Sequence, residues 1–146
     1  MYVTRVLLDD RRIDVSERRA TERAVADRVR EMLERSIPAT RLPGAGGWSG
    51  WTLVELDAGA GAEVERAMSI ARATDSLYSI RVWDSREGDH VLVDPYCLEE
   101  DEVPVFFGQP GATVRRWCVS LDLAWPAIEY FIVKGERFPG VTWEPA

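Results

Sequence analysis

The chain contains one histidine and two cysteines, which limits the covalent chemistry that its side chains could perform. Cys97 could act as a nucleophile only if His90 activated it, because the chain has no other imidazole base. The two residues lie seven positions apart with Pro95 between them, and no third group is marked to orient the histidine. Cys97 and Cys118 form no CxxC pair, so the spacing does not fit a zinc site. We therefore expect no catalytic residues and no bound metal.

Carboxylates are the other groups that could do chemistry. Asp84, Glu87 and Asp89 lie close together, but the calcium-loop pattern with its glycine and distal glutamate is absent. A carboxylate pair for glycoside hydrolysis would depend on a separation that only the fold sets. The glycine-rich residues 38–50 contain no phosphate-loop motif and precede a strand instead of opening a helix, so no nucleotide cofactor is expected.

Negative charge is concentrated in one part of the chain. Residues 83–102 contain a single arginine, Arg86, and eight carboxylates: Asp84, Glu87, Asp89, Asp94, Glu99, Glu100, Asp101 and Glu102. Four consecutive like charges at residues 99–102 repel one another, which opposes folding. The segment is interpreted either as a solvated loop or as an electrostatic surface that meets a basic groove.

Length and composition fit one soluble globular domain over residues 1–146, with 46% hydrophobic and 29% charged residues. A net charge of −7 and a pI near 4.8 argue against nucleic-acid binding, which needs a basic face. No apolar run reaches the length of a membrane span, and Asp9 and Asp10 follow the first apolar run too soon for a secretory signal. We expect a cytoplasmic protein whose cysteines pack as small hydrophobic residues, with a disulfide between them as the alternative.

The most strongly patterned element is a helix over residues 123–134. Ala124, Ala127, Ile128 and Phe131 recur at the spacing of one buried helix face. Asp122 is expected to cap its first turn, where Pro126 is still tolerated, and Gly135 suits the left-handed residue that closes it.

The preceding chain is divided into shorter elements. We expect strands at residues 2–8 and 51–56, helices at residues 17–35 (capped by Ser16) and 61–73, and hairpins at residues 77–94 and at 103–107 with 113–119. The order predicts an α+β single domain with a largely antiparallel sheet of five or six strands and about three helices packed on it. Trp48, in the glycine-rich loop, is either a core lid or a contact residue.

The C-terminal residues resemble a known signature. A helix that ends in Gly-Glu-Arg, followed by a proline-containing turn and a terminal hydrophobic-x-Trp, is similar to the end of the Imm-one immunity proteins of bacterial polymorphic toxin systems. The matching residues are Ala127, Phe131, Gly135, Glu136, Arg137, Val141 and Trp143. In this chain Phe138 stands before Pro139, whereas the family pattern has proline directly after the arginine. We expect these residues to be mainly structural, as a helix cap, a turn and a core anchor.

The resemblance implies an antidote that binds a cognate toxin domain, often a nucleic-acid deaminase. A deaminase holds its target base in a pocket beside a basic channel, which an acidic protein could close. We therefore expect a non-enzymatic inhibitor that occludes the entrance of the toxin's active site. The expected contact residues are Asp84, Glu87, Asp89, Glu99, Glu100, Asp101 and Glu102, with Trp48, Trp83 and Tyr96 as aromatic anchors. The alternatives are a small enzyme or ligand-binding domain with a tryptophan-lined pocket, and a scaffold that only self-associates.

Overall fold

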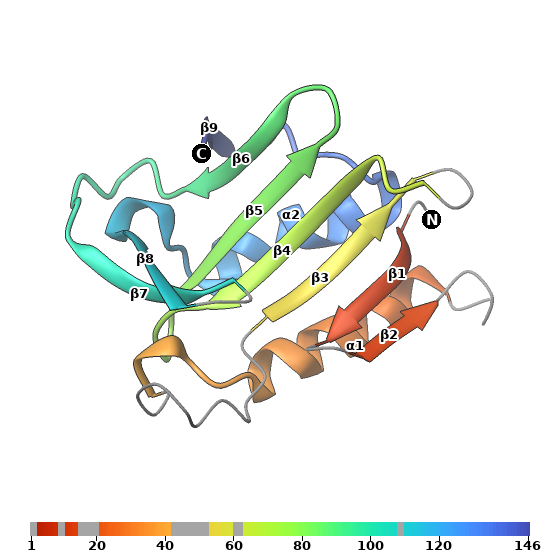
Figure 1. Ribbon diagram of the computed structural model, residues 1–146, viewed down its shortest axis with the longest axis horizontal. Coiled ribbons are helices and arrows are strands. Elements are labelled where there is room, and N and C mark those ends of the chain that lie inside the picture. Colours follow the sequence, from red (N-terminus) through yellow and green to blue (C-terminus); the bar gives the residue numbers. More distant parts are fainter. Residues whose placement is uncertain (1–2, 9–10, 15–20, 42–52, 60–62, 108–109) are drawn as a thin grey trace.

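The computed structural model describes residues 3–8, 11–14, 21–41, 53–59, 63–107 and 110–146. Within these residues the largest element is a seven-stranded antiparallel sheet with the order β2-β1-β3-β4-β5-β6-β9 (Figure 1). Its strands are β1 (Val3–Leu8), β2 (Arg11–Asp14), β3 (Leu53–Ala58), β4 (Arg66–Arg72), β5 (Tyr78–Asp84), β6 (Gly88–Val93) and β9 (Thr142–Pro145). Four of the six pairs of neighbouring strands are also consecutive in the sequence, as is usual for antiparallel sheets.

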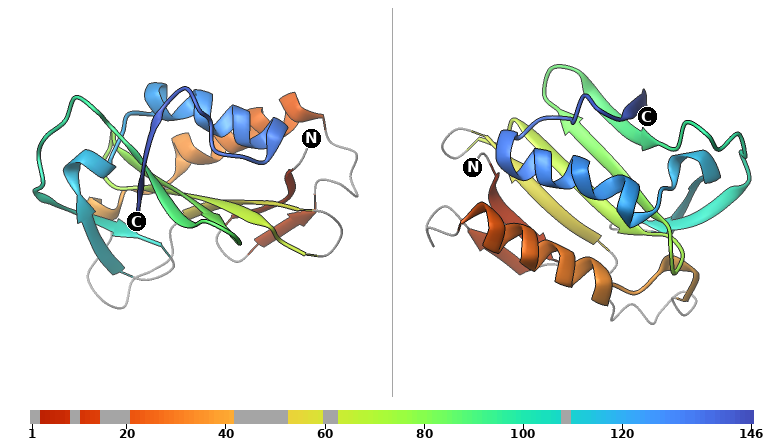
Figure 2. Two further views of the ribbon diagram at one scale, coloured as in Figure 1. Left: turned by 90° about the horizontal axis from the view of Figure 1, so that it is seen from above. Right: turned by 180° about the vertical axis from the view of Figure 1, so that it is seen from behind.

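Two helices, α1 (Glu22–Arg35) and α2 (Leu121–Lys134), pack side by side on one face of the sheet (Figure 2). Each helix buries one stripe of apolar residues, and β3, β4, β5 and β6 contribute the facing side chains. The core formed between them includes the fully buried side chains Leu33, Leu56, Met68, Ile70, Ile80, Leu92, Ile128 and Phe131.

Local capping residues set the ends of both helices. The Thr21 hydroxyl accepts a hydrogen bond from the amide of Ala24 at 3.1 Å, and the Ser120 hydroxyl accepts one from Leu123 at 3.3 Å. Gly135 closes α2 with φ of 68° and ψ of 23°, and its amide donates to the carbonyl of Phe131 at 2.7 Å. A positive φ strains residues with a Cβ atom, which explains the glycine at this position.

A second, two-stranded sheet lies on the sheet face opposite the helices (Figure 2). It consists of β7 (Glu102–Phe106) and β8 (Pro110–Val114), and the short helical turns η1 (Ala39–Arg41) and η2 (Arg115–Trp117) adjoin it. Val103 and Val105 of β7 form a small buried cluster with Ala73 and Cys118. The Arg81 guanidinium lies 4.8 Å from the ring centre of Phe107, which joins β5 to the end of this hairpin.

The expected α+β class is confirmed, but the number of helices is not. The described residues contain two α-helices where about three were expected, and the main sheet is larger than five or six strands. The helix expected at residues 61–73 is wrong, because Arg66–Arg72 form the central strand β4. Met68 and Ile70 face the helices while Ala67 and Ala71 are buried on the other face. Because β4 carries apolar residues on both faces, their spacing in the sequence resembles that of a buried helix face.

Other expected boundaries differ by a few residues. The helix expected to begin at residue 17 begins at Glu22 with Thr21 as its cap, and Ser16 lies outside the described residues. The C-terminal helix is capped by Ser120, while Asp122 lies in its first turn. Both expected hairpins are present, although residues 115–117 form the η2 turn rather than strand. In the described part of the chain, no helix is long and apolar enough to cross a membrane.

Candidate functional site

A pocket of about 370 Å³ brings the carboxylates Asp84 and Glu87 together with the C-terminal signature. It lies where the loop after α2 passes the ends of β4 and β5 and the turn between β5 and β6. Its lining residues are Arg66, Val82, Asp84, Glu87, Glu136, Arg137, Phe138, Pro139 and Trp143. We call it the C-terminal pocket. Arg66 and Trp143, 77 positions apart in the sequence, therefore meet at one place.

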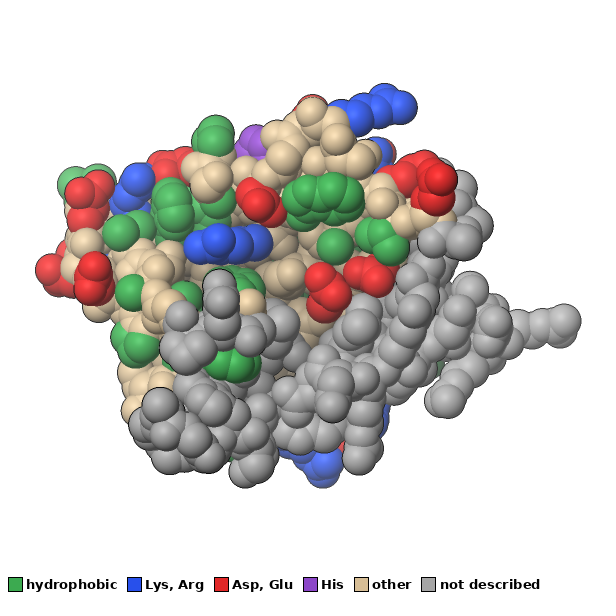
Figure 3. Space-filling view, viewed as in Figure 1, with side chains coloured by type: hydrophobic (Ala, Val, Ile, Leu, Met, Phe, Trp, Pro, Cys, Tyr) green, Lys and Arg blue, Asp and Glu red, His purple; other side chains and the backbone are tan. Residues whose placement is uncertain are grey.

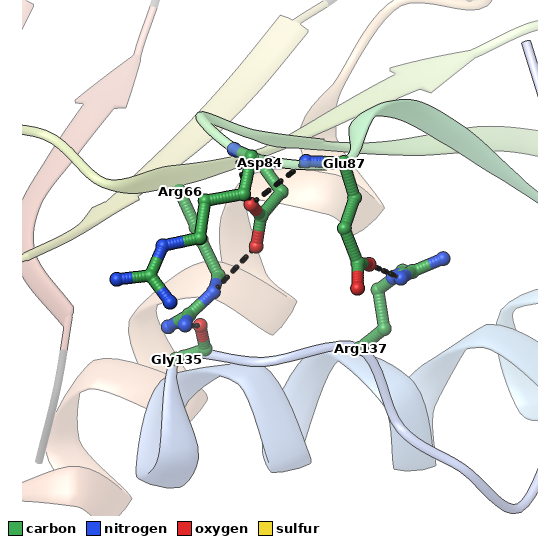
Figure 4. Close-up of polar contacts among 6 residues, drawn as sticks. Arg66, Asp84, Glu87, Gly135 and Arg137 are labelled. Atoms are coloured by element: carbon green, nitrogen blue, oxygen red, sulfur yellow. Dashed lines mark hydrogen bonds and ion pairs between the residues drawn. The ribbon is translucent and has the colours of Figure 1, made fainter.

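Asp84 and Arg66 form the central ion pair of this pocket (Figure 4). The Arg66 Nε donates to Asp84 Oδ2 at 2.8 Å, and its Nη1 donates to the carbonyl of Gly135 at 3.1 Å. The other carboxylate oxygen of Asp84 accepts the amides of Arg86 at 2.7 Å and Glu87 at 3.2 Å. One carboxylate thus holds the β5–β6 turn, while one arginine joins β4, β5 and the end of α2.

Burial by itself would raise the pKa of Asp84. The amide of Arg86, the Arg66 guanidinium and the amide of Glu87 outweigh that effect and lower the pKa of Asp84 below its ordinary value. The carboxylate is therefore ionised throughout the neutral range. Its two oxygens accept hydrogen bonds from Arg66, Arg86 and Glu87 of this chain.

Arg137 of the signature forms an ion pair with Glu87 on the facing turn (Figure 4). Asp84 and Glu87, both expected to contact a partner, are thus already paired with arginines of this chain. Glu136 between Gly135 and Arg137 is exposed and lines the pocket. Among the described residues its carboxylate has no ion-pair partner.

The remaining signature residues support the fold. Ala127 and Phe131 are fully buried in the main core, and Val141 packs against that core. Trp143 is half-buried in β9, and its indole N–H donates to the carbonyl of Phe138 at 2.9 Å. This hydrogen bond fixes the orientation of the indole ring at the pocket wall.

The acidic segment, residues 94–102, lies at the other end of β6 and is held by its backbone. Its carbonyls accept hydrogen bonds from η2: Arg116 N donates to Glu99 O at 3.1 Å, and Arg115 N donates to Asp101 O at 2.9 Å. Asp94 Oδ1 accepts the amide of Tyr96 at 3.0 Å, which forms a tight turn at its start. Because these hydrogen bonds involve the backbone, most side chains of the segment remain free to face solvent.

Arg116 is the cation that partly neutralises this segment. It pairs with Glu144 of β9 and lies 3.5 Å from a carboxylate oxygen of Glu100. The indole N–H of Trp117 also donates to Glu144 at 2.9 Å. That hydrogen bond, with the Arg116 guanidinium, lowers the pKa of Glu144 despite some desolvation. Glu100 and Glu144 thus belong to one internal charge network.

Most of the other side chains of the acidic segment face solvent. Tyr96 is 93% exposed and Leu98 is 88% exposed, the two most exposed large hydrophobic residues of the described chain. Glu99, Asp101 and Glu102 are exposed beside them, with no ion pair among the described residues. Figure 3 shows acidic side chains gathered at the end of the molecule where β6 leads into β7 in Figure 1. An aromatic and an aliphatic side chain are therefore surrounded by unpaired carboxylates.

Trp83 and Asp89 occupy a third region, on the helix-free face of the sheet. They are direct cross-strand partners in the β5–β6 ladder, and Trp83 is 41% exposed. The indole is thus neither a core residue nor fully open to solvent. Trp48, the third expected anchor, lies outside the described residues.

The groups considered for catalysis are arranged as follows. His90 lies in β6 opposite Val82, and Cys97 lies half-buried beyond the end of that strand. Cys97 and Cys118 are both free thiols, so the disulfide alternative is not present. Burial raises the pKa of Cys118 to about 11, which leaves it an unreactive thiol. In the described part of the chain, no group of three or more His, Cys, Asp or Glu is placed to hold a metal ion.

Three residues that organise these regions were not singled out in the sequence. Arg66 was hidden in a segment expected to be helical, so its position beside Asp84 was not visible. Arg116 was overlooked because its partner, Glu144, is 28 positions away. Leu98 alone carried a signal, as an aliphatic residue directly before four carboxylates.

The chain was compared with protein-family models and with curated proteins, and neither comparison finds a match. The likeness to the Imm-one immunity proteins thus rests on the C-terminal residues described above.

Proposed function

We propose that this protein is an immunity protein, which binds a cognate toxin domain and occludes the entrance of its active site. The observation that carries the proposal is the exposed surface of the acidic segment, where Tyr96 and Leu98 stand among Glu99, Asp101 and Glu102. Such a surface combines apolar contact area with negative charge. A basic protein surface is its natural complement.

Charged and aromatic side chains contribute differently to such an interface. Exposed carboxylates steer a basic partner and penalise wrong partners, which acts mainly on the association rate. Aromatic side chains that become buried supply much of the contact energy, so Tyr96 is the expected anchor. The hydrogen bonds from η2 hold the segment in place before binding, which reduces the entropy lost on association.

The resemblance at the C-terminus suggests which partner this is. In the proposed complex, the toxin is a nucleic-acid deaminase and the acidic segment covers its basic nucleic-acid channel. Asp84, Glu87 and Glu100 serve mainly inside this chain, since each faces an arginine. Trp83 and Asp89 add a second contact area, and the protein acts in the cytoplasm without catalysis of its own.

A stoichiometric inhibition assay tests this function. A pull-down from the native cells with this protein as bait supplies candidate partners, and each candidate is then purified and assayed for deamination of nucleic acid. The proposal expects one partner whose activity falls linearly to zero as the ratio approaches one to one. A captured protein whose activity is unaffected does not support it. Turnover of a substrate by the purified chain alone would favour the alternative of a small enzyme.

A further inference from the structure

The C-terminal pocket is adjoined by a second hollow of about 230 Å³ that shares Arg66 and Asp84 with it. Glu63, Glu65 and Arg86 lie on the wall of the smaller hollow. The larger one, at about 370 Å³, falls in the size range of sites that take small ligands, roughly 300 to 1,000 Å³. Together they form a depression at the opposite end of β6 from the acidic segment.

Some charged side chains of this depression form ion pairs within the chain, and others do not. Arg66 and Arg137 are each paired with a carboxylate of the chain, so their positive charge is locally neutralised. Glu136, exposed on the pocket wall, has no ion-pair partner in the described part of the chain. The pocket is therefore electronegative although two of its lining residues are arginines.

The pocket that Glu136 lines also has an aromatic wall. Phe138 and Trp143 both line the pocket, and the hydrogen bond from the Trp143 indole to the Phe138 carbonyl couples their positions. Aromatic faces attract cations, and a planar guanidinium stacks on them better than a compact ammonium does. A carboxylate beside an aromatic face is thus suited to a guanidinium.

We propose that the C-terminal pocket receives an arginine side chain from the protein partner, with Glu136 as the carboxylate that pairs with it and Phe138 and Trp143 as the aromatic wall. This inference rests on the proposed function, because it assigns the arginine to the partner that the acidic segment binds. Glu87 of the pocket directly precedes the six-residue strand β6 and the acidic segment follows that strand, so these parts of the two regions are about 20 Å apart. One interface of ordinary size spans that distance.

Binding of a free arginine derivative tests the pocket without any partner. The ¹⁵N-labelled protein is titrated with N-acetyl-arginine amide while the Trp143 indole signal, assigned with Trp143→Phe, and the amides of residues 135–140 are followed. We expect saturable shifts confined to these signals, with a dissociation constant in the millimolar range, as befits one side chain. Glu136→Gln should weaken binding about three- to tenfold, because one charge-assisted contact is lost.

Matched controls separate this site from general attraction of cations. Glu129→Gln removes another exposed carboxylate, from α2, and should leave the affinity unchanged. N-acetyl-glutamine amide, which lacks the charge, should produce no saturable shift. Inorganic phosphate tests the opposite assignment, an anion site at Arg66 and Arg137, and saturable phosphate shifts in the same signals would overturn the proposal.

The possible results for pocket and function can be told apart. Shifts that are absent, or equal in the wild type and Glu136→Gln, overturn the arginine site even if a toxin is found that this protein inhibits. Arginine binding that depends on Glu136 supports the site, and the inhibition assay then decides the proposed function separately. In the complex, Glu136→Gln should raise the dissociation constant about tenfold while Glu129→Gln does not.

Discussion

Asp84 shows how one carboxylate can determine several local structures. It accepts the Arg66 guanidinium on one oxygen and two turn amides on the other, and Arg66 extends the link to the carbonyl of Gly135. The side chain of Asp84 is only 14% exposed, so water replaces these contacts poorly. The pair is therefore expected to contribute to stability more than a surface ion pair does.

Replacing Asp84 with asparagine keeps the shape but removes the charge. We expect Asp84→Asn to lower the free energy of unfolding by about 1 to 3 kcal/mol near neutral pH, because Arg66 is left without a counter-charge. The pKa of Asp84 is lowered in the folded state, so the wild type holds this advantage above the ordinary value of 3.8. The difference should shrink as the pH falls below that value. Urea unfolding of both proteins across this range measures it.

The control for this experiment is Asp27→Asn, which changes an exposed aspartate of α1. Asp27 has no ion pair in the described part of the chain, so its substitution should change stability by less than about 0.5 kcal/mol. A deficit of Asp84→Asn that stays constant down to strongly acidic pH would show that the lost contact is not electrostatic.

The two cysteines should differ sharply in reactivity. Cys118 is fully buried and burial raises its pKa to about 11, whereas Cys97 is half-buried. Since the thiolate is the reactive form, iodoacetamide at mildly alkaline pH should modify Cys97 of the native protein and leave Cys118 intact. Peptide mass spectrometry reads out the two sites, and Cys97→Ser should leave the native protein unmodified. Equal modification rates without denaturant would contradict the buried position of Cys118.

At the scale of elements, the turn after α2 connects the helix to the pocket. Gly135 has a positive φ, its amide closes the helix, and its carbonyl binds Arg66. Gly135→Ala should therefore destabilise the protein by about 1 to 2 kcal/mol, the cost of a left-handed residue with a Cβ atom. Gly135→Asn should cost less, because asparagine tolerates this conformation better. Thermal unfolding of the wild type and the two variants measures their relative stabilities. Equal stability of Gly135→Ala and the wild type would disprove the role of the positive φ.

Elements with one buried face were predictable from the sequence. The stripe of Val25, Val29 and Leu33 in α1 is buried as expected, because helical spacing on a polar background admits one interpretation. Ala127 and Phe131 in α2 are also buried as expected. The central strand β4 was not predictable in this way. It is covered on both faces, so its apolar residues follow no period that distinguishes a strand from a helix.

The same difference applies to the candidate site. Local features such as the run of carboxylates at residues 99–102 and the glycine cap were visible in the sequence. The pairing of Asp84 with Arg66 and of Glu87 with Arg137 was not, because the second pair joins residues 50 positions apart. Sequence alone therefore identified where negative charge is concentrated, but not which carboxylates the fold itself neutralises.

At the scale of the whole molecule, the distribution of charge matters more than its total. A net charge of −7 attracts a basic protein from any direction, but only charges within about 8 Å of the contact act strongly at physiological salt. The acidic segment and the C-terminal pocket both adjoin the edge of the sheet that β6 and β9 form. For the basic partner proposed above, we therefore expect attraction toward this edge rather than toward the helices.

Charge reversal at two matched places tests this orientation. Glu99→Lys/Glu102→Lys changes the acidic segment, and Asp27→Lys/Glu129→Lys changes exposed positions on the two helices. Both variants alter the net charge equally, from −7 to −3. If the acidic segment faces the partner, the first should slow association with the inhibited toxin at least about tenfold at low salt, and the second much less. Stopped-flow association rates measure both.

The dependence of the rates on salt concentration distinguishes long-range electrostatic attraction from direct contacts in the complex. At about 1 M salt the screening length falls to about 3 Å, so the rates of the wild type and both variants should converge if the exposed carboxylates act mainly through long-range attraction. The dissociation rate should change less than the association rate, because Tyr96 and Leu98 remain to supply the contact. If both double variants slow association to the same degree, the net charge alone governs the encounter and the acidic segment does not orient it. If neither does, the partner approaches a different face of the protein.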